Sequence, residues 1–313
     1  MTEEQDRYEG AMLGLAIGDA VGWPVEFMSL DRIRARYGPG GIRDLESSDR
    51  HPAGTFTDDT QMSLALARGI LSKGAESEES FIAEVAREFV AWARSPENDR
   101  APGATCMSAC QELARDLTWR APGHNNSKGC GTAMRSAPIG LAWHGNEERI
   151  IRLANETSTL THGHPTATAG SVATALLVGW ALDGLSPLEM HERLLARTRP
   201  VSQEFAAKIA QVPTVLDQEP DSAYAVLGGA WVAEEAIACA LYTFWRSPED
   251  YRRTVLTAVN MNGDSDSVGC IAGAISGAFN GVEAIAAEWR AKVEQADELS
   301  KVAVALFEFA RGR

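Results

Sequence analysis

Cysteine is scarce in this sequence, and its arrangement does not suit a disulfide framework. The chain has 313 residues and only five cysteines, an odd number, and no two of them have the CxxC spacing. Proteins that depend on disulfides carry paired, regularly spaced cysteines. The sequence therefore fits a reducing compartment, and we expect Cys106 and Cys110 to be core thiols.

Positive charge is lacking as well. The 29 lysines and arginines are outnumbered by 43 aspartates and glutamates, the net charge is −14, and no basic run is present. A charge of this sign repels nucleic acid and anionic membrane surfaces at long range. We therefore expect no nucleic-acid and no membrane partner, and an anionic ligand would need a locally favourable pocket.

Targeting and membrane-spanning patterns are also missing. The first ten residues, MTEEQDRYEG, are acidic and lack the basic-then-apolar order of a secretory signal. Residues 166–182 come nearest to a membrane span, but their threonine and serine content and ordinary length favour a buried helix. The sequence predicts a soluble, cytoplasmic protein.

The sequence shows no convincing series of alternating strands. Apolar residues instead recur with the helical period along most of the chain, which predicts an all-α fold. Length alone does not decide between one domain and two. The predicted helices include residues 8–20, 80–93, 229–245, 249–259 and 282–313.

Glycine recurs every fourth residue in two of the predicted helices, at Gly10, Gly14 and Gly18 and again at Gly269, Gly273 and Gly277. Glycine costs about 1 kcal/mol relative to alanine inside a helix. A glycine stripe along one side therefore predicts that another backbone approaches that side closely. We expect both helices to pack near the site described next.

Two acidic motifs lie far apart in the chain. Residues 54–61 read GTFTDDTQ and contain Asp58 and Asp59, while residues 260–270 read NMNGDSDSVGC and contain Asp264 and Asp266. If folding brings the four carboxylates together, each pair at about 4 Å repels by roughly 4 kcal/mol at an effective dielectric near 20. A helix N-terminus offsets only about 0.3–1 kcal/mol per charge. The motifs therefore predict one or two divalent cations.

Oxygen ligands suit Mg²⁺, Mn²⁺ or Ca²⁺, whereas zinc favours histidine or cysteine. The simpler alternative is helix capping, with Thr57 or Asp58 as the N-cap residue and Gln61 completing an approximate capping box. Either motif alone would favour capping. Two acidic pairs beside hydroxyl groups favour the metal site.

Three further segments carry candidate functional residues. Asp19 and Glu26 flank a turn at Trp23 and Pro24, and a carboxylate there could present an acid or base to a cleft. Residues 121–141 hold a Gly-x-Gly loop that could turn N–H groups toward a phosphate, followed by a short helix that Pro138 is expected to stop. Local evidence alone favours an ordinary loop there. His162 and His164 precede an alanine-rich helix, which Thr161 could cap, and we expect a hydrogen-bonding role for one of them.

Five motifs in order resemble the ADP-ribosylglycohydrolase family, which includes the dinitrogenase reductase-activating glycohydrolases. They read GAMLGLAIGDAVGWPVEF, GTFTDDTQ, SKGCGTAMRSAP, THGHPTA and NGDSDSVGCIAGAISGA. The resemblance implies one compact orthogonal helical domain over residues 1–313, with two Mg²⁺ or Mn²⁺ ions in a central cleft. The metal ligands that it implies are Thr57, Asp58, Asp59, Asp264, Asp266 and Ser267.

The same resemblance assigns the remaining roles. It implies that Glu26 is an acidic residue beside the metals, that Ser127, Lys128, Gly129, Cys130 and Gly131 form the diphosphate loop, and that His162 lies near the bound ribose. We expect Glu26 to be the catalytic residue and Asp19 to belong with the substrate-binding residues. The implied reaction releases ADP-ribose from an ADP-ribosylated protein or small molecule by cleaving the C1″ bond, with an arginine-linked acceptor favoured. The sequence departs from the family at Cys130, where many members carry asparagine. It also departs at Ala101, Pro102 and Gly103, where some arginine-directed members carry Asp-Ile-Gly.

Two other classes of protein compete with the hydrolase. A terpene-synthase-like enzyme is also all-α with Asp-rich Mg²⁺ motifs, but it would need a more extended acidic pattern, and residues 268–273 supply no acid. A catalytically silent ADP-ribose-binding or structural protein on the same fold is the closer alternative, because a fold alone fixes no activity.

Overall fold

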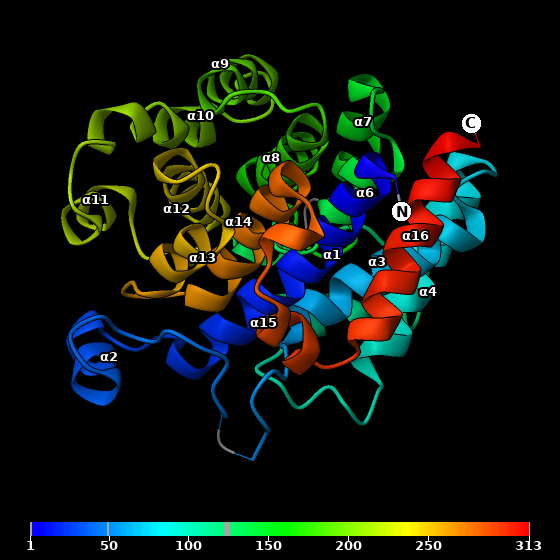
Figure 1. Ribbon diagram of the computed structural model, residues 1–313. Helices are drawn as coiled ribbons and strands as arrows, with labels where there is room; N and C mark the ends of the chain where they lie inside the picture. Colours follow the sequence, from blue (N-terminus) through cyan, green and yellow to red (C-terminus); the bar gives the residue numbers. More distant parts are fainter. Residues whose placement is uncertain (1, 49, 122–125, 313) are drawn as a thin grey trace.

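The computed structural model of the protein describes residues 2–48, 50–121 and 126–312 (Figure 1). Within these ranges the chain forms α-helices and short 3₁₀ helices and no strand, which confirms the predicted all-α fold. The elements are α1 (Glu3–Gly22), η1 (Trp23–Val25), α2 (Leu30–Tyr37), α3 (Asp58–Lys73), α4 (Glu78–Ala93), α5 (Ala104–Leu113), η2 (Cys130–Thr132), α6 (Ala137–Ala142), α7 (Glu147–Ser158), α8 (Pro165–Leu182), α9 (Pro187–Thr198), α10 (Gln203–Ile209), η3 (Val212–Val215), α11 (Pro220–Leu227), α12 (Ala233–Arg246), α13 (Tyr251–Val259), α14 (Ser265–Asn280), η4 (Val282–Ala284), α15 (Ala287–Lys292) and α16 (Ala296–Arg311).

Helices α1 and α14 form the centre of the molecule and run antiparallel. A Cβ atom built on Gly14 would lie 2.4 Å from the carbonyl oxygen of Gly273, and one on Gly18 would lie 1.9 Å from that of Gly269. Only glycine allows two backbones to approach this closely. The glycine stripes therefore face each other, which confirms that each is the contact surface for another backbone.

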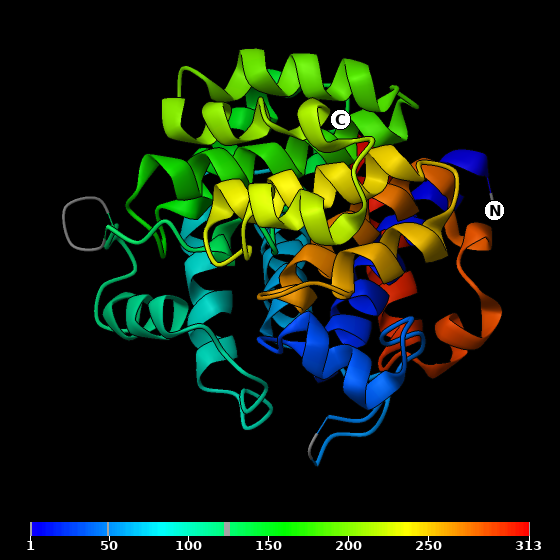
Figure 2. The ribbon, with the colours of Figure 1, turned by 90° about the vertical axis from the view of Figure 1, so that its left-hand side faces the viewer.

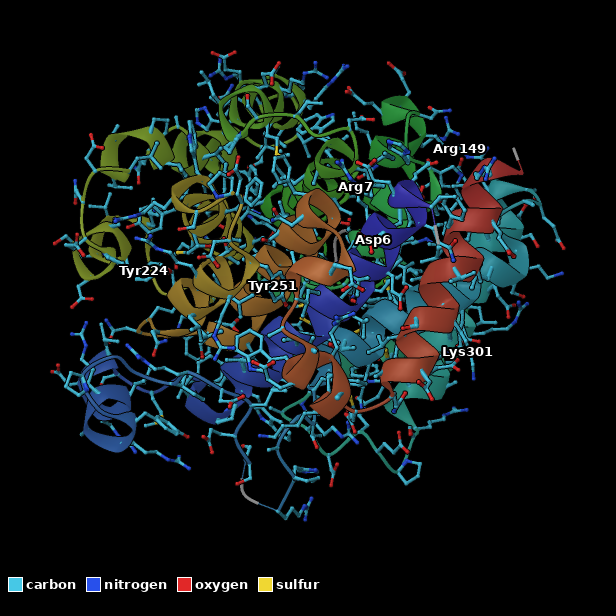
Figure 3. All side chains as sticks on the ribbon, viewed as in Figure 1. Asp6, Arg7, Arg149, Tyr224, Tyr251 and Lys301 are labelled. Carbon is cyan, nitrogen blue, oxygen red and sulfur yellow. The ribbon has the colours of Figure 1, made fainter. Side chains whose placement is uncertain are left out.

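The central pair separates two groups of helices. In Figures 1 and 2, α8, α9, α10 and α12 lie on one side of α1 and α14, and α3, α4 and α16 lie on the other. Long-range hydrogen bonds tie α1 to its neighbours: Tyr251 of α13 donates to the carbonyl oxygen of Gly14 (2.8 Å), and Arg7 of α1 donates to that of Leu182 in α8 (3.0 Å). Tyr251 and Arg7 are labelled in Figure 3. One continuous hydrophobic core results.

Helix α8 is the core helix that the sequence predicts. It is long and apolar enough to cross a membrane, but 94% of it is buried inside the fold. Such burial is typical of the central helix of a water-soluble protein. His164, rather than Thr161, caps this helix, because its ring nitrogen Nδ1 accepts a hydrogen bond from the backbone N–H of Thr166 (3.0 Å).

Several predicted helix bounds are wrong: α1 begins at Glu3 and not at residue 8, and α12 begins at Ala233 and not at residue 229. Two further differences have a clear physical reason. Pro138 lies in the first turn of α6 and does not end a helix, because proline lacks only an N–H that the first turn leaves unpaired. The predicted final helix is divided into η4, α15 and α16. Between α15 and α16, the backbone N–H of Glu294 donates to Gly54 (3.0 Å), and Gln295 adopts a left-handed φ of 53°. This break brings Glu294 to the loop that precedes α3.

Candidate active site

The first acidic pair occupies the first turn of α3. Thr57 is the N-cap residue, and its hydroxyl oxygen accepts a hydrogen bond from the backbone N–H of Asp59 (3.3 Å). The Thr57 cap of the capping alternative is therefore present, whereas the Gln61 side chain forms no capping box and instead donates to the carbonyl oxygen of Glu97 and accepts from Trp92. The cap does not exclude metal binding, because a hydroxyl oxygen has a second lone pair. Asp58 and Asp59 are both buried, and Asp58 accepts a hydrogen bond from the backbone N–H of Gly103 (3.1 Å).

The second acidic pair lies at the start of α14. Asp264 is the N-cap residue of α14, and its backbone N–H donates to the carbonyl oxygen of Gly229 (3.0 Å). The hydroxyl of Ser265 donates to the carbonyl oxygen of Gly22 at the end of α1 (3.1 Å). The close packing of α1 and α14 thus fixes the turn that carries Asp264 and Asp266.

Folding brings the two acidic pairs into one cavity of about 420 Å³. Glu26, from the segment after η1, lines the same cavity. Carboxylate oxygens of Glu26, Asp264 and Asp266 lie within 4.8 Å of one another, close enough to share a metal ion. The other lining residues that the sequence singles out are Ser127, Gly129, Cys130, Gly131, His162 and Ser267.

The carboxylates of this cavity are difficult to ionise together. Burial, followed by the negative charges of Asp264 and Asp58, raises the pKa of Glu26 to about 9. Burial raises the pKa of Asp58 to about 7, and it raises the pKa values of Asp59 and Asp266 well above the ordinary range, helped by neighbouring carboxylates. A dication in the cavity would reverse these shifts, because opposite charge favours the ionised form.

Two buried oxygens support cation binding directly. Within the described ranges, Oδ2 of Asp59 and Oδ1 of Asp266 have no hydrogen-bond partner. Both side chains are almost fully buried, and a buried polar atom without a partner is costly to the fold. A hard divalent cation would satisfy both oxygens, so the residues fit the metal that the motifs predict.

Asp19 lies inside α1, away from the lining of the cavity. Its buried carboxylate accepts hydrogen bonds from the backbone N–H groups of Thr57 (3.0 Å) and Thr60 (3.0 Å) and from the Thr60 hydroxyl (2.6 Å). Burial raises the pKa of Asp19 to about 6, while these hydrogen bonds act in the opposite direction. These hydrogen bonds fix the start of α3 against α1. Contact between Asp19 and the substrate stays a prediction.

The Gly-x-Gly loop packs on the segment before α12. The backbone N–H of Cys130 donates to the carbonyl oxygen of Trp231 (3.3 Å), and its thiol donates to Oδ2 of Asp264 (2.9 Å). The ammonium of Lys128 is not in the cavity lining and pairs with Glu204 (2.6 Å) and Glu234 (2.8 Å). Lys128 therefore reaches a phosphate only if it exchanges these carboxylate partners.

His162 is held as a neutral ring beside the loop. Burial and the charge of Arg135 lower its pKa to about 3. Arg135 donates to the hydroxyl oxygen of Thr161 (2.7 Å), and that oxygen lies 2.8 Å from Nδ1 of His162. If the Thr161 hydroxyl donates to Nδ1, the ring proton lies on Nε2, which points toward Gly129 and Gly131. His162 then offers an N–H donor to the cavity.

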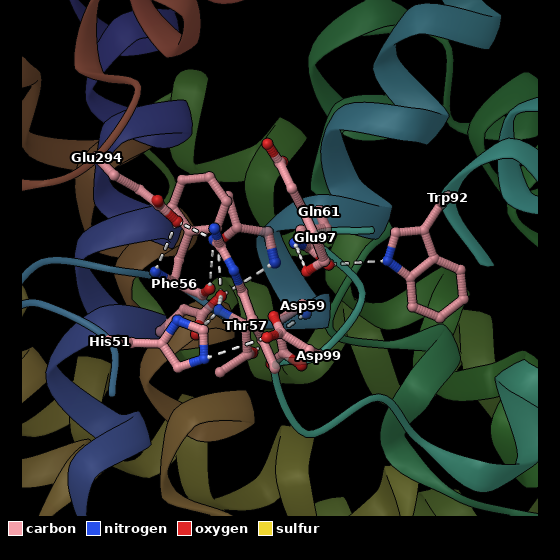
Figure 4. A network of polar contacts seen from close by, with 12 residues as sticks. His51, Phe56, Thr57, Asp59, Gln61, Trp92, Glu97, Asp99 and Glu294 are labelled. Atoms are coloured by element: carbon pink, nitrogen blue, oxygen red, sulfur yellow. Dashed lines mark hydrogen bonds and ion pairs between the residues drawn. The ribbon is translucent and has the colours of Figure 1, made fainter. Parts of the chain in front are cut away.

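Residues 95–103, called the strap here, form the loop that the sequence predicts, and Ala101, Pro102 and Gly103 at its end line the cavity. The sequence did not reveal how the strap is anchored. Figure 4 shows two of its anchors: Gln61 donates to the backbone carbonyl oxygen of Glu97 (3.0 Å), and Asp99 lies 3.8 Å from Nε2 of His51. Asp99 also pairs with Arg50 (2.6 Å), and Arg100 pairs with Glu294. These anchors join segments that are remote in sequence, so only the acidic and basic residues of the loop could have hinted at them.

The sequence also did not reveal two aromatic side chains at the cavity. Phe27 and Trp231 line it and are 46% and 60% exposed. The Gly-Gly-Ala before Trp231 is a turn signal that could have marked this residue as surface-exposed.

Comparisons with known proteins identify the family of this chain. A family model described as ADP-ribosylglycohydrolase matches residues 1–313. The chain is 29% identical over 289 residues to ADP-ribosyl-[dinitrogen reductase] glycohydrolase of Rhodospirillum rubrum, covering 92% of this chain and 90% of the relative. It is 30% identical over 316 residues to ADP-ribosylarginine hydrolase Tri1 of Pseudomonas putida, covering 98% and 80%. A solved structure described as an ADP-ribosylglycohydrolase-related protein complex matches with a TM-score of 0.79 at 28% identity, covering 99% of this chain and 100% of the other. The chain therefore belongs to the ADP-ribosylglycohydrolase family.

Proposed function

We propose that this enzyme is a metal-dependent hydrolase that cleaves the C1″ glycosidic bond between ADP-ribose and a modified acceptor side chain, reversing mono-ADP-ribosylation. The observation that carries the proposal is the cavity in which Asp58 and Asp59 meet Asp264 and Asp266. An arginine-linked acceptor is favoured, since the relative from Pseudomonas putida is named an ADP-ribosylarginine hydrolase. The substrate is an ADP-ribosylated protein or small molecule in the cytoplasm, and the product is ADP-ribose.

The residues proposed to hold two divalent cations, Mg²⁺ or Mn²⁺, are Thr57, Asp58, Asp59, Asp264, Asp266 and Ser267. When bound, such cations act as Lewis acids that lower the pKa of water and orient it together with the ribose hydroxyls. The unpaired oxygens of Asp59 and Asp266 support this assignment.

Glu26 is proposed to accept or relay the proton of the attacking water. Its carboxylate lies near Asp264 and Asp266, and it is the part-exposed carboxylate among the acidic residues that line the cavity. A general base must reach both the nucleophile and a route for the proton. As the C1″ bond breaks, positive charge develops on the ribose ring, and the surrounding carboxylates stabilise it.

The remaining predicted residues are proposed to bind the substrate. Ser127, Gly129, Cys130 and Gly131 would face the diphosphate, with Lys128 nearby, and the Nε2–H of His162 would donate to the distal ribose. Asp19 would act indirectly, by holding the start of α3 in place through its hydrogen bonds with Thr57 and Thr60. The lining of the cavity supports these roles for the loop and for His162.

The proposal is tested by ADP-ribose release from defined ADP-ribosylated peptides, measured by mass spectrometry with and without Mg²⁺ or Mn²⁺. We expect Asp58→Ala and Asp264→Asn to abolish release while the helical circular dichroism is retained. Asp297→Asn, at an exposed position in the first turn of α16, is the matched control and should keep full activity. Full activity in Asp264→Asn would overturn the assignment.

The same experiment separates the hydrolase from a catalytically silent ADP-ribose-binding protein. Calorimetry of the wild-type chain with ADP-ribose and Mg²⁺ measures binding, and mass spectrometry measures turnover. Binding without release from any modified peptide would favour the silent protein. Release that depends on added cation supports the hydrolase.

A further inference from the structure

Lys128 belongs to the Gly-x-Gly loop, but its ammonium is bound outside the cavity lining. Its Nζ atom pairs with carboxylate oxygens of Glu204 (2.6 Å) and Glu234 (2.8 Å). Glu204 lies in the first turn of α10, and Glu234 lies in the first turn of α12. Hydrogen bonds to Glu204 and then to Glu234 raise the pKa of Lys128, so its ammonium stays charged. One lysine thus ties the loop to two helices.

Glu234 depends on this lysine. Its side chain is buried, and within the described ranges its Oε2 atom has no hydrogen-bond partner. A buried carboxylate is costly to the fold unless a cation pairs with it. Among the described residues, Lys128 is the cation that forms an ion pair with Glu234. If Lys128 left this position, it would leave a buried negative charge unpaired.

The backbone beside Lys128 is also tied to the start of α12. The carbonyl oxygen of Lys128 accepts a hydrogen bond from the N–H of Ala233 (2.9 Å), and the N–H of Cys130 donates to the carbonyl oxygen of Trp231 (3.3 Å). The ion pair with Glu204 extends this support to α10. The loop is therefore held by its backbone and by the Lys128 side chain together.

The cavity offers the diphosphate no basic side chain. Among the described lining residues none is lysine or arginine, whereas Gly129, Cys130 and Gly131 do line the cavity. Backbone N–H groups of such a turn can bind phosphate oxygens, and binding is tighter when the turn is already held in the bound conformation. Glycine by itself permits many conformations. The loop therefore needs support from outside, which Lys128 and its two carboxylates can supply.

We propose that Lys128 is a positioning residue, whose ion pairs with Glu204 and Glu234 hold residues 129–131 in the conformation that binds the diphosphate, and that it does not itself bind the phosphates. This inference rests on the proposed function and adds how the loop is held. The competing role is direct contact, in which Lys128 leaves its carboxylates to bind phosphate. Glu204 supports binding in the first role and competes with the phosphates in the second.

Glu204→Gln is therefore the decisive variant, because the two roles predict opposite effects. The Glu204 side chain is 52% exposed, so the substitution removes a charge without disturbing the core. The Kd for ADP-ribose is measured by calorimetry in Mg²⁺. We expect it to rise about threefold, because an ion pair that holds the loop is lost. Direct contact predicts a lower Kd, because the lysine is released to the phosphates.

Two substitutions of Lys128 complete the test. Lys128→Met leaves Glu234 unpaired, so we expect Kd for ADP-ribose and KM for the modified peptide to rise about tenfold with little change in kcat. Lys128→Arg keeps the positive charge and should bind ADP-ribose within about twofold of wild type. The helical circular dichroism should be retained in each variant. Lys301→Met, at an exposed position on α16 (Figure 3), is the matched control and should bind like wild type.

Each other outcome has a defined meaning. A lower Kd in Glu204→Gln would show that Lys128 binds the phosphates, and an unchanged Kd in both Glu204→Gln and Lys128→Met would show that the ion pairs stabilise only the fold. Both results overturn the inference and leave the hydrolase intact. A loss of kcat at unchanged KM in Lys128→Met would also overturn it. Failure of the wild-type chain to bind ADP-ribose in Mg²⁺ would overturn the proposed function, and the positioning role with it.

Discussion

Glu26 differs from the four aspartates of the cavity because it is partly exposed whereas they are buried. Burial and the charge of Asp264 raise its pKa to about 9, so in the absence of cations the side chain is neutral at physiological pH. A bound dication would favour the carboxylate form that a general base requires.

Replacing Glu26 by glutamine should therefore remove the base and keep its size. We expect kcat for ADP-ribose release to fall by about 100-fold or more, because general-base catalysis contributes about that much. The number of Mn²⁺ ions bound, measured by calorimetry, should not change. Loss of one bound ion would instead make Glu26 a ligand, and activity within twofold of wild type would remove it from the mechanism. Glu298→Gln, on the surface of α16, is the control.

The buried carboxylates also predict how stability depends on pH. Burial raises the folded-state pKa to about 6 for Asp19, about 7 for Asp58 and about 9 for Glu26, above their ordinary values of 3.8, 3.8 and 4.5. Between about pH 4 and 9 the folded chain therefore binds more protons than the unfolded chain, so its stability falls as pH rises.

In EDTA we expect Tm, measured by calorimetry, to decrease by several degrees from pH 5 to pH 8. Added Mg²⁺ should raise Tm more at pH 8 than at pH 5, because the ionised carboxylates then gain a partner. A Tm in EDTA that rises over this interval would contradict the account. Asp264→Asn should flatten the dependence.

At the scale of elements, the contact between α1 and α14 positions both the loop after α1 and the start of α14. A Cβ atom on Gly14 would lie 2.4 Å from the Gly273 carbonyl oxygen, and the obstacle is backbone that has no flexible end to move aside. We expect Gly14→Ala to lower the free energy of unfolding by about 3 kcal/mol or more. Urea denaturation followed by circular dichroism measures the change.

Gly179 in α8 is the matched control for that substitution. A Cβ atom there would have its nearest neighbours at 3.6 Å, an ordinary contact distance. Gly179→Ala should therefore be neutral or stabilise the fold by up to about 1 kcal/mol through helix propensity. Equal losses in the two variants would show that the close approach at Gly14 has no special role.

The elements also show which features of the fold a sequence can reveal. The two glycine stripes are periodic, so their contact was predictable from residues 10–18 and 269–277 alone. Pro138 was misread because proline fits both the end of one helix and the first turn of the next. The break before α16 depends on Glu294, which joins Gly54 and Arg100 from distant parts of the chain. The sequence pattern around residue 294 cannot predict contacts with residues so far away in the chain.

For the molecule as a whole, the convergence of the acidic motifs was predicted from their likeness, since each sets two carboxylates beside hydroxyl groups, and the two motifs do meet in one cavity. Asp19 was harder to interpret, since its partners Thr57 and Thr60 become visible only when α1 packs beside α3. The stacked pair of Phe27 and Trp231 was missed for a related reason, because these residues are 204 positions apart and meet only in the fold.

The central claim is that two remote acidic segments enclose the same cations. Anomalous diffraction from a crystal grown with Mn²⁺ tests it most directly, because the scattering locates manganese independently of any assumed ligand. The account predicts manganese peaks between the Asp58–Asp59 turn of α3 and the Asp264–Asp266 turn of α14, with loss of occupancy in Asp264→Asn. Manganese bound only elsewhere on the molecule, or no peak in this cavity at saturating Mn²⁺, would contradict it.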